Sequence, residues 1–83
     1  MPKPYMPDGV KNLVARQLIS LRKQNHLSQR DLARKMQSAG YAVDKNVITR
    51  IESNKRYVTD IELKAFCEIF QVTYEYLITG KAK

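Results

Sequence analysis

Residues 28–52 read SQRDLARKMQSAGYAVDKNVITRIE, and this stretch decides the fold. It opens with Ser28 and, three positions later, Asp31. This pair is typical of a helix start, because each side chain can accept the backbone N–H of the other residue. The apolar residues that follow share one helical face: Leu32, Ala33 and Met36. The sequence therefore predicts an amphipathic helix over residues 28–36.

A second short helix is predicted after a turn. Asp44 can cap it, and Ile48 and Ile51 recur at the spacing that places them on its inner face. Its polar residues point away from that face: Lys45, Asn46, Thr49 and Arg50. Two capped helices, of which the second projects long hydrogen-bonding side chains, are typical of an element that reads DNA.

The residues in and around this stretch resemble the phage-repressor and Cro-type (Xre-like) helix-turn-helix family. The resemblance is carried by Ser28-Gln29, Leu32-Ala33, Ile48-Thr49-Arg50-Ile51-Glu52 and Asn54-Lys55-Arg56. It extends over about residues 10 to 80. It implies an all-α fold, a compact five-helix lambda-repressor-like DNA-binding domain with the helix-turn-helix at helices 2 and 3.

Apolar spacing predicts a helix ahead of this motif. Asp8 can cap it, and we expect it to end near Asn25. The residues that recur at helical spacing are Val10, Leu13, Val14, Gln17, Leu18 and Leu21, and all but Gln17 are apolar. Later helices must cover this apolar stripe.

Two more helices are predicted after the motif. Thr59 and Glu62 form a second capping box, and Thr73 caps a last helix over residues 74–79, which Gly80 ends in a left-handed conformation. The apolar face behind the capping box, which we expect at the heart of the core, consists of Leu63, Phe66, Cys67 and Phe70. No alternation typical of strands competes with this all-α interpretation.

The 83 residues suit one small domain, which we expect over residues 9–80. Residues 1–8 hold all three prolines and are expected to be an extended or disordered lead. Residues 81–83 form a basic tail.

The turn between the two central helices is longer than the family pattern. Ala33 and Ile48 lie fifteen positions apart, against ten in most relatives, so residues 37–43 replace a tight turn. Gly40 is expected at a positive φ there. Tyr41 either covers the edge of the core or lies beside the DNA backbone, and we favour the first.

His26 and Gln71 stand where relatives commonly have glycine. We therefore expect Asn25 or His26 to adopt a left-handed conformation at the end of the first helix, because both tolerate it better than branched residues do.

The net charge of +7 is unevenly distributed. Residues 28–56 hold seven basic and three acidic residues, whereas residues 57–78 hold one and four. Such a folded domain has a basic side that attracts a polyanion.

Composition also excludes several classes of protein. Cys67 is the single cysteine, so an internal disulfide is impossible, and no cluster of Cys and His has zinc-site spacing. No apolar run could cross a membrane, and the N-terminal residues lack the apolar core of a signal peptide. We expect a cytoplasmic protein that is not an enzyme and binds no metal or cofactor.

The resemblance implies that the second helix of the motif, over residues 45–54, enters the major groove. The residues it would set against base edges are Lys45, Asn46, Val47, Thr49 and Arg50. Those it would set against phosphates are Ser28, Gln29, Arg30, Asn54, Lys55, Arg56 and Tyr57. For Val47 the alternative is a place at the core edge. The resemblance also implies a structural ion pair between Arg22 and Glu52.

These patterns lead us to expect sequence-specific binding of double-stranded DNA by a transcriptional regulator, a repressor that acts as a homodimer on a two-part operator. The alternative is an antitoxin or protein-interaction module, which binds a protein partner and represses its own promoter. The last helix either supplies a dimer contact or completes the monomer's core through Tyr74, Tyr76, Leu77 and Ile78.

Overall fold

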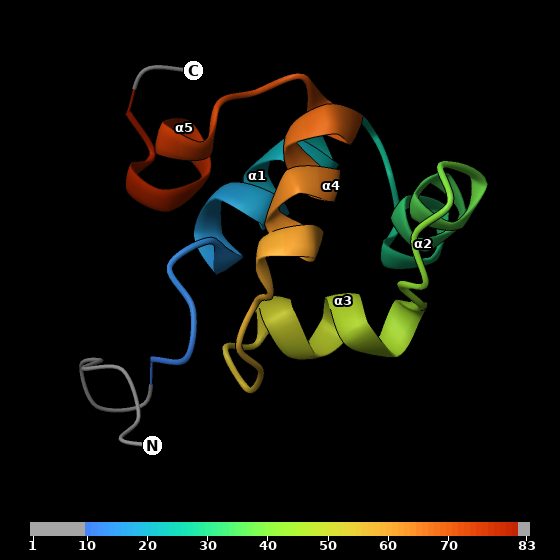
Figure 1. Ribbon diagram of the computed structural model, residues 1–83, viewed down its shortest axis with the longest axis horizontal. Helices are drawn as coiled ribbons and strands as arrows, with labels where there is room; N and C mark the ends of the chain where they lie inside the picture. The colour runs from blue at the N-terminus through green and yellow to red at the C-terminus, as the bar shows by residue number, and fades with distance from the viewer. Residues whose placement is uncertain (1–9, 82–83) are drawn as a thin grey trace.

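The computed structural model describes residues 10–81, and within them it contains five α-helices and no strand (Figure 1). The helices are α1 (Ala15–Gln24), α2 (Gln29–Ser38), α3 (Lys45–Glu52), α4 (Asp60–Phe70) and α5 (Tyr74–Thr79). The predicted all-α, five-helix class is therefore confirmed. The predicted N-terminal lead with Asp8, and residues 82–83 of the predicted tail, lie outside the described residues.

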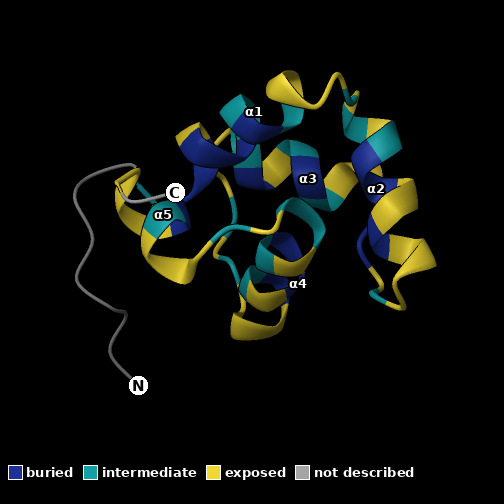
Figure 2. Cartoon of the chain, turned by 90° about the horizontal axis from the view of Figure 1, so that it is seen from above, coloured by how far each residue is buried: buried dark blue, intermediate teal, exposed yellow. Residues whose placement is uncertain are grey.

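Every helix contributes to one core, and the buried faces turn toward one another (Figure 2). α1 packs against α3 and α5, and α2 packs against α3 and α4. The largest fully buried side chains are Leu18, Leu32, Met36, Ile48, Ile51, Phe66 and Leu77. Each contributes about 1.5–3 kcal/mol by burial. Of the apolar face predicted on α4, Phe66 is fully buried, while Leu63, Cys67 and Phe70 pack against the core with part of their surface exposed.

All predicted N-caps of the helices from α2 onward are present. Ser28 accepts the N–H of Asp31 at 3.0 Å, and the carboxylate of Asp31 accepts the N–H of Ser28 at the same distance. Asp44, Thr59 and Thr73 accept the corresponding N–H groups of α3, α4 and α5. Each such cap stabilises its helix by about 1 kcal/mol.

The predicted start of the first helix is wrong. α1 begins at Ala15, and Val10 and Leu13 precede it, with Leu13 54% exposed. The reason is Asn12, whose Oδ1 accepts the N–H groups of Val14 and Ala15 at 3.1 and 2.9 Å. This side chain satisfies the first free N–H groups of the helix, so the chain before it is not helical.

Among the described residues, three other than glycine have a positive φ: His26 at 57°, Asn54 at 61° and Gln71 at 54°. The expected left-handed residue after α1 is thus His26. Asn54 was not expected there, and its conformation corrects the predicted helix over residues 45–54, because α3 ends at Glu52. Gly40 has the expected positive φ, at 95°.

The long turn between α2 and α3 is tied to its neighbours. Tyr41 packs against the core, as favoured above, and its hydroxyl donates to the carboxylate of Glu68 on α4. Gln37 donates to the carbonyl of Val43 at 3.2 Å, and Val43 is buried. The extra residues are therefore held in place without separating the two helices.

Candidate nucleic-acid interface

The start of α3 carries exposed polar side chains. Lys45, Asn46 and Arg50 are exposed, and within residues 10–81 no hydrogen bond or ion pair holds their side chains. Asp44 fixes the backbone below them by accepting the N–H of Val47 at 2.9 Å. These three predicted base-contacting residues are therefore available to an external ligand.

Two other predicted contact residues are joined to each other. The hydroxyl of Thr49, which was expected to face bases, donates to Oε1 of Gln29 at 2.7 Å. The side-chain amide of Gln29, which was expected to face phosphate, donates to Oε1 of Glu52 at 2.9 Å. Both residues are only partly exposed. The hydroxyl of Thr49 thus ties α3 to the start of α2, and a base contact by Thr49 stays a prediction.

The ion pair between Arg22 and Glu52 is present and connects α1 with the end of α3. Arg22 Nε donates to Glu52 Oε2 at 2.8 Å, and Nη2 donates to Oε1 at 3.1 Å. The two side chains are only 14% and 6% exposed. Arg22 Nη1 also donates to the carbonyl of Leu27 at 2.9 Å. The pair thus orients α1, α2 and α3 relative to one another.

Two residues of the loop after α3 that were predicted to contact phosphate make contacts within the domain. Asn54 Oδ1 accepts the backbone N–H groups of Lys11 and Asn12, each at 2.9 Å. Arg56 Nη1 donates to Glu62 Oε1 at 2.6 Å. Burial raises the pKa of Glu62, but the hydrogen bonds from Arg56 and Thr59 outweigh burial, so the pKa is lowered overall. These contacts are structural in the first place.

The remaining predicted phosphate-contacting residues lie at the surface. Ser28 is exposed, with its hydroxyl in the α2 cap. Arg30 and Lys55 are exposed, and among the described residues nothing pairs with their side chains. Tyr57 is 43% exposed, and the ammonium of Lys11 lies 5.9 Å from the centroid of its ring.

Val47 is half-buried and packs against the core. Its side chain therefore lies at the core edge, which was the alternative to a base contact.

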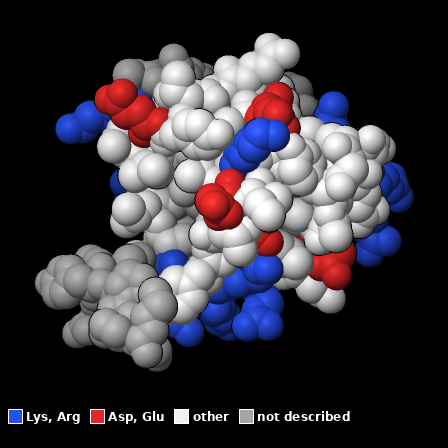
Figure 3. Space-filling model, viewed as in Figure 1, with Lys and Arg blue, Asp and Glu red and all other residues white. Residues whose placement is uncertain are grey.

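Positive charge gathers on the side of the molecule where α3 lies. In the view shared by Figures 1 and 3, α3 runs along the lower edge, and Lys and Arg side chains cluster there. Acidic side chains are scattered above this edge (Figure 3). The lower edge in this view is thus basic, as expected for one side of the domain.

Asn12 is the structural residue that sequence reasoning missed. It is 6% exposed, and its Nδ2 donates to the carbonyls of Ile51 and Arg56, both at 3.0 Å. An asparagine three positions ahead of an apolar helical repeat is a capping signal, which could have identified its role in α1. Its hydrogen bonds to the end of α3 and the loop after it cannot be predicted from the residues near Asn12 in the sequence.

Other kinds of site find no support in the described part of the chain. Residues 10–81 contain no group of three or more His, Cys, Asp or Glu side chains that could hold a metal ion. Burial raises the pKa of the Cys67 thiol, which keeps it in the less nucleophilic form. No helix among the described residues has both the length and the apolar character needed to cross a membrane.

The arrangement is that of two capped helices, of which the second presents unpaired polar residues on a basic side of the domain. A family model described as helix-turn-helix matches residues 18–77, which include all of α2, α3 and α4. No curated protein and no solved structure matches the chain significantly. Proteins of this family bind DNA and regulate transcription. The chain therefore belongs to the Cro/C1-type helix-turn-helix family.

Proposed function

We propose that this protein is a repressor that binds a specific double-stranded DNA sequence by setting the first turns of α3 into the major groove. The observation that carries the proposal is that Lys45, Asn46 and Arg50 at that helix are exposed and that, within residues 10–81, nothing pairs with their side chains. An asparagine amide can bond both N6 and N7 of adenine, and a lysine ammonium can donate to O6 or N7 of guanine. A good bidentate pair discriminates against a wrong base by about 1–3 kcal/mol.

Phosphate contacts supply the rest of the affinity. The N-terminus of α2 presents backbone N–H groups and the positive end of a helix dipole, which favour a phosphate. The amide of Gln29 has a second hydrogen beyond the one it donates to Glu52, and Arg30 and Lys55 add unpaired cations. Because Gln29, Thr49 and Glu52 are bonded together, the phosphate-binding and base-reading helices reach DNA as one rigid unit.

The proposed mode of action is that the bound protein occupies its DNA site and so blocks transcription. We propose that it acts in the cytoplasm. The described domain measures 35 × 27 × 19 Å. A body of this size over a promoter excludes polymerase from the same groove. Half-sites one helical turn apart lie about 34 Å from centre to centre, close to the 35 Å length of the domain, so two bound copies can touch. We therefore propose a homodimer on a two-part operator.

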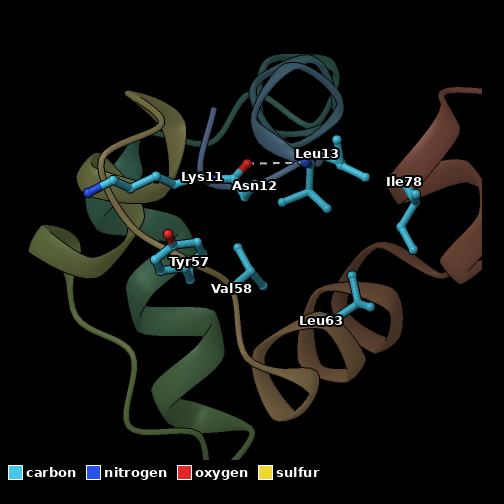
Figure 4. A pocket seen from close by; sticks show the side chains of 8 residues that line it. Lys11, Asn12, Leu13, Tyr57, Val58, Leu63 and Ile78 are labelled. Atoms are coloured by element: carbon cyan, nitrogen blue, oxygen red, sulfur yellow. Dashed lines mark hydrogen bonds between the residues drawn. The ribbon is translucent and has the colours of Figure 1, made fainter. Parts of the chain in front are cut away.

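An apolar surface is available for that contact. All large apolar side chains that are exposed within residues 10–81 border two adjoining hollows that share Leu63. They are Leu13, Tyr57, Ile61, Tyr74 and Ile78. One of the two hollows is an open groove of about 190 Å³, and Val58 and Leu63 are among the residues that line it (Figure 4). We call the whole region the apolar face.

A second copy of the chain suits the apolar face because the charges around it are mixed. Lys11 and Lys64 lie at its rim together with Asp60. A two-fold axis sets each surface against itself, and a rim of both signs can then pair with its own copy. Of the predicted residues of α5, Tyr74 and Ile78 fit this role, whereas Leu77 is fully buried in the monomer.

The protein-interaction function remains the second candidate, and the same apolar face favours it. The two candidate functions differ in how the wild-type protein behaves without a partner protein. A repressor dimer self-associates through the face and selects a DNA sequence without any partner. An antitoxin-like module keeps the face for another protein.

The decisive experiment selects bound duplexes from a random pool, then titrates the winner and a scrambled duplex at several salt concentrations. We expect a two-part winner that binds at least about 10³-fold more tightly than the scrambled duplex, the ratio that is typical of specific DNA binding. Equal affinity for both duplexes, falling equally with salt, would overturn sequence-specific binding.

The dimer is tested by sedimentation of the protein alone and on the selected duplex. We expect two copies per duplex for the wild type. Ile61→Lys on the apolar face should halve this stoichiometry, whereas the control Ser38→Lys on the exposed end of α2 should not. A single wild-type copy on the duplex would overturn the homodimer.

A further inference from the structure

The segment just before α1 is fastened to the end of α3. Asn54 Oδ1 accepts the N–H groups of Lys11 and Asn12, each at 2.9 Å. In return, Asn12 Nδ2 donates to the carbonyls of Ile51 and Arg56, each at 3.0 Å. These four hydrogen bonds cross 39 to 44 positions of sequence. We call this set of bonds the Asn12–Asn54 clasp.

The clasp holds the backbone of Lys11 beside the loop that follows α3. The side chain of Lys11 is exposed and points away from Leu63 and Ile78 at the other end of the groove (Figure 4). Its ammonium lies 5.9 Å from the centroid of the Tyr57 ring. That distance is at the outer limit of a cation–π contact, and the three N–H donors of the ammonium stay available.

Lys55 lies in the same loop, two residues before Tyr57. It is exposed, and among the described residues its side chain has no ion-pair or hydrogen-bond partner. Arg56 between them is different, because Glu62 neutralises it. The loop after α3 therefore carries the ammonium of Lys55 and has the ammonium of Lys11 beside its Tyr57 ring, and within residues 10–81 neither group has an ion-pair partner.

The length of α3 sets what these groups can reach. Its eight residues rise by about 12 Å at 1.5 Å per residue, and the major groove is about 12 Å wide. If the start of α3 lies against base edges, its far end lies at the rim of the groove. The rim is phosphate backbone, which ammonium groups bind as point charges.

We propose that Lys11, Lys55 and Tyr57 form a composite site for a backbone phosphate of duplex DNA, positioned by the Asn12–Asn54 clasp. Lys11 precedes the residues that the helix-turn-helix family model matches, so the family pattern gives it no part in binding. The inference rests on the proposed function, because it requires α3 to face DNA. It adds a segment outside the two helices of the motif to the binding surface.

The test measures how binding of duplex DNA depends on salt for Lys11→Gln and for the matched control Lys81→Gln. Both variants lose one exposed positive charge, but Lys81 follows α5, far from α3 in Figure 1. Loss of one phosphate contact lowers the slope of log K against log salt by about 0.9. We expect this loss for Lys11→Gln, no loss for Lys81→Gln, and an unchanged slope for Lys11→Arg. Equal slopes for Lys11→Gln and Lys81→Gln overturn the proposal.

A second arm tests the clasp. Asn54→Ala removes the acceptor that holds Lys11, so adding Lys11→Gln to Asn54→Ala should change the slope by less than half of what it does alone. If Lys11→Gln changes the slope in the Asn54→Ala protein as much as it does in the wild type, Lys11 acts through its charge alone and the Asn12–Asn54 clasp does not position it. Circular dichroism at the assay temperature verifies that each variant is folded.

The two proposals fail separately. The slope can be measured on the selected and on the scrambled duplex. If the wild type binds both equally, sequence-specific recognition is overturned while the slopes still show whether Lys11 contacts phosphate. If the wild type prefers the selected duplex and Lys11→Gln has the same salt slope as Lys81→Gln, only the composite phosphate site is overturned.

Discussion

Arg22 and Glu52 meet through two parallel hydrogen bonds, of 2.8 and 3.1 Å, and the carboxylate also accepts the amide of Gln29 at 2.9 Å. A charge on α1 thereby holds the end of α3, while α3 in turn holds the start of α2. The bidentate geometry and the low exposure of both side chains make this pair stronger than an ordinary surface ion pair.

Glu52→Ala should lower the free energy of unfolding by about 3 kcal/mol, because it leaves the guanidinium of Arg22 without its partner in a mostly buried site. Urea unfolding at neutral pH measures this loss. Binding of the selected duplex should weaken as well, since Gln29 loses its anchor. A loss below about 1 kcal/mol would mean that solvent screens the pair as it does at a surface.

Asn46→Ala should reduce the preference for the selected duplex over its single-base variants by about tenfold, while the unfolding midpoint stays unchanged. The side chain is exposed and bonded to nothing within residues 10–81, so only the complex should feel its loss. Competition binding measures the preference. Ser38→Ala, an exposed polar truncation on α2, serves as control and should leave the preference intact.

Lys55→Gln and Arg56→Gln remove neighbouring charges with opposite expected results. Lys55→Gln should lower the salt slope of DNA binding by about 0.9 at constant stability. Arg56→Gln should cost about 2 kcal/mol of stability, because Glu62 is then buried without its ion-pair partner. Salt titrations and urea unfolding of both variants give the comparison. The same pattern in both variants would contradict the separate roles.

Gln71→Gly should raise the free energy of unfolding by about 0.5–1 kcal/mol, because a side chain in the left-handed region is strained and glycine is not. Asn54→Gly relieves similar strain but should still lower stability by about 1–2 kcal/mol, since two backbone N–H groups lose their acceptor. Thermal unfolding distinguishes the two. A gain in both variants would show that the Asn12–Asn54 clasp adds little to stability.

Stability should fall on acidification in a way that depends on Glu62. Its pKa in the folded chain lies below the ordinary value of 4.5. The carboxylate therefore contributes stability above about pH 4.5, and this contribution is lost as the pH falls through the lower folded pKa. Glu62→Gln should be less stable than the wild type at pH 7 and lose less between about pH 5 and 3. Parallel curves for the two proteins would contradict the shift.

The sequence predicts best what depends on near neighbours. Ser28 with Asp31, and Thr59 with Glu62, form capping boxes over three positions, so their spacing alone identifies both helix starts. The buried positions of α2 and α3 also follow from helical spacing.

What the sequence does not predict depends on distant partners. Asn54 and Arg56 look like solvated members of a basic loop, and only the positions of Asn12 and Glu62 in space give them structural roles. The start of α1 fails for a local reason, because the apolar Val10 and Leu13 extend the helical pattern past Asn12, whose side chain accepts the N–H groups of Val14 and Ala15. Thr49 has the polarity of an outward residue, but its hydroxyl finds Gln29 on another helix.

The Asn12–Asn54 clasp bears on how the reading helix can be used in protein engineering. Asn12, which lies ahead of α1, donates to the carbonyl of Ile51 in the last turn of α3 and to the carbonyl of Arg56 in the loop that follows. A transplant of residues 28–52 onto another scaffold would leave the Ile51 carbonyl without this donor, and the end of the helix would fray. The helix-turn-helix segment therefore depends on residues outside it, and a functional graft has to include residues 11–12 as well.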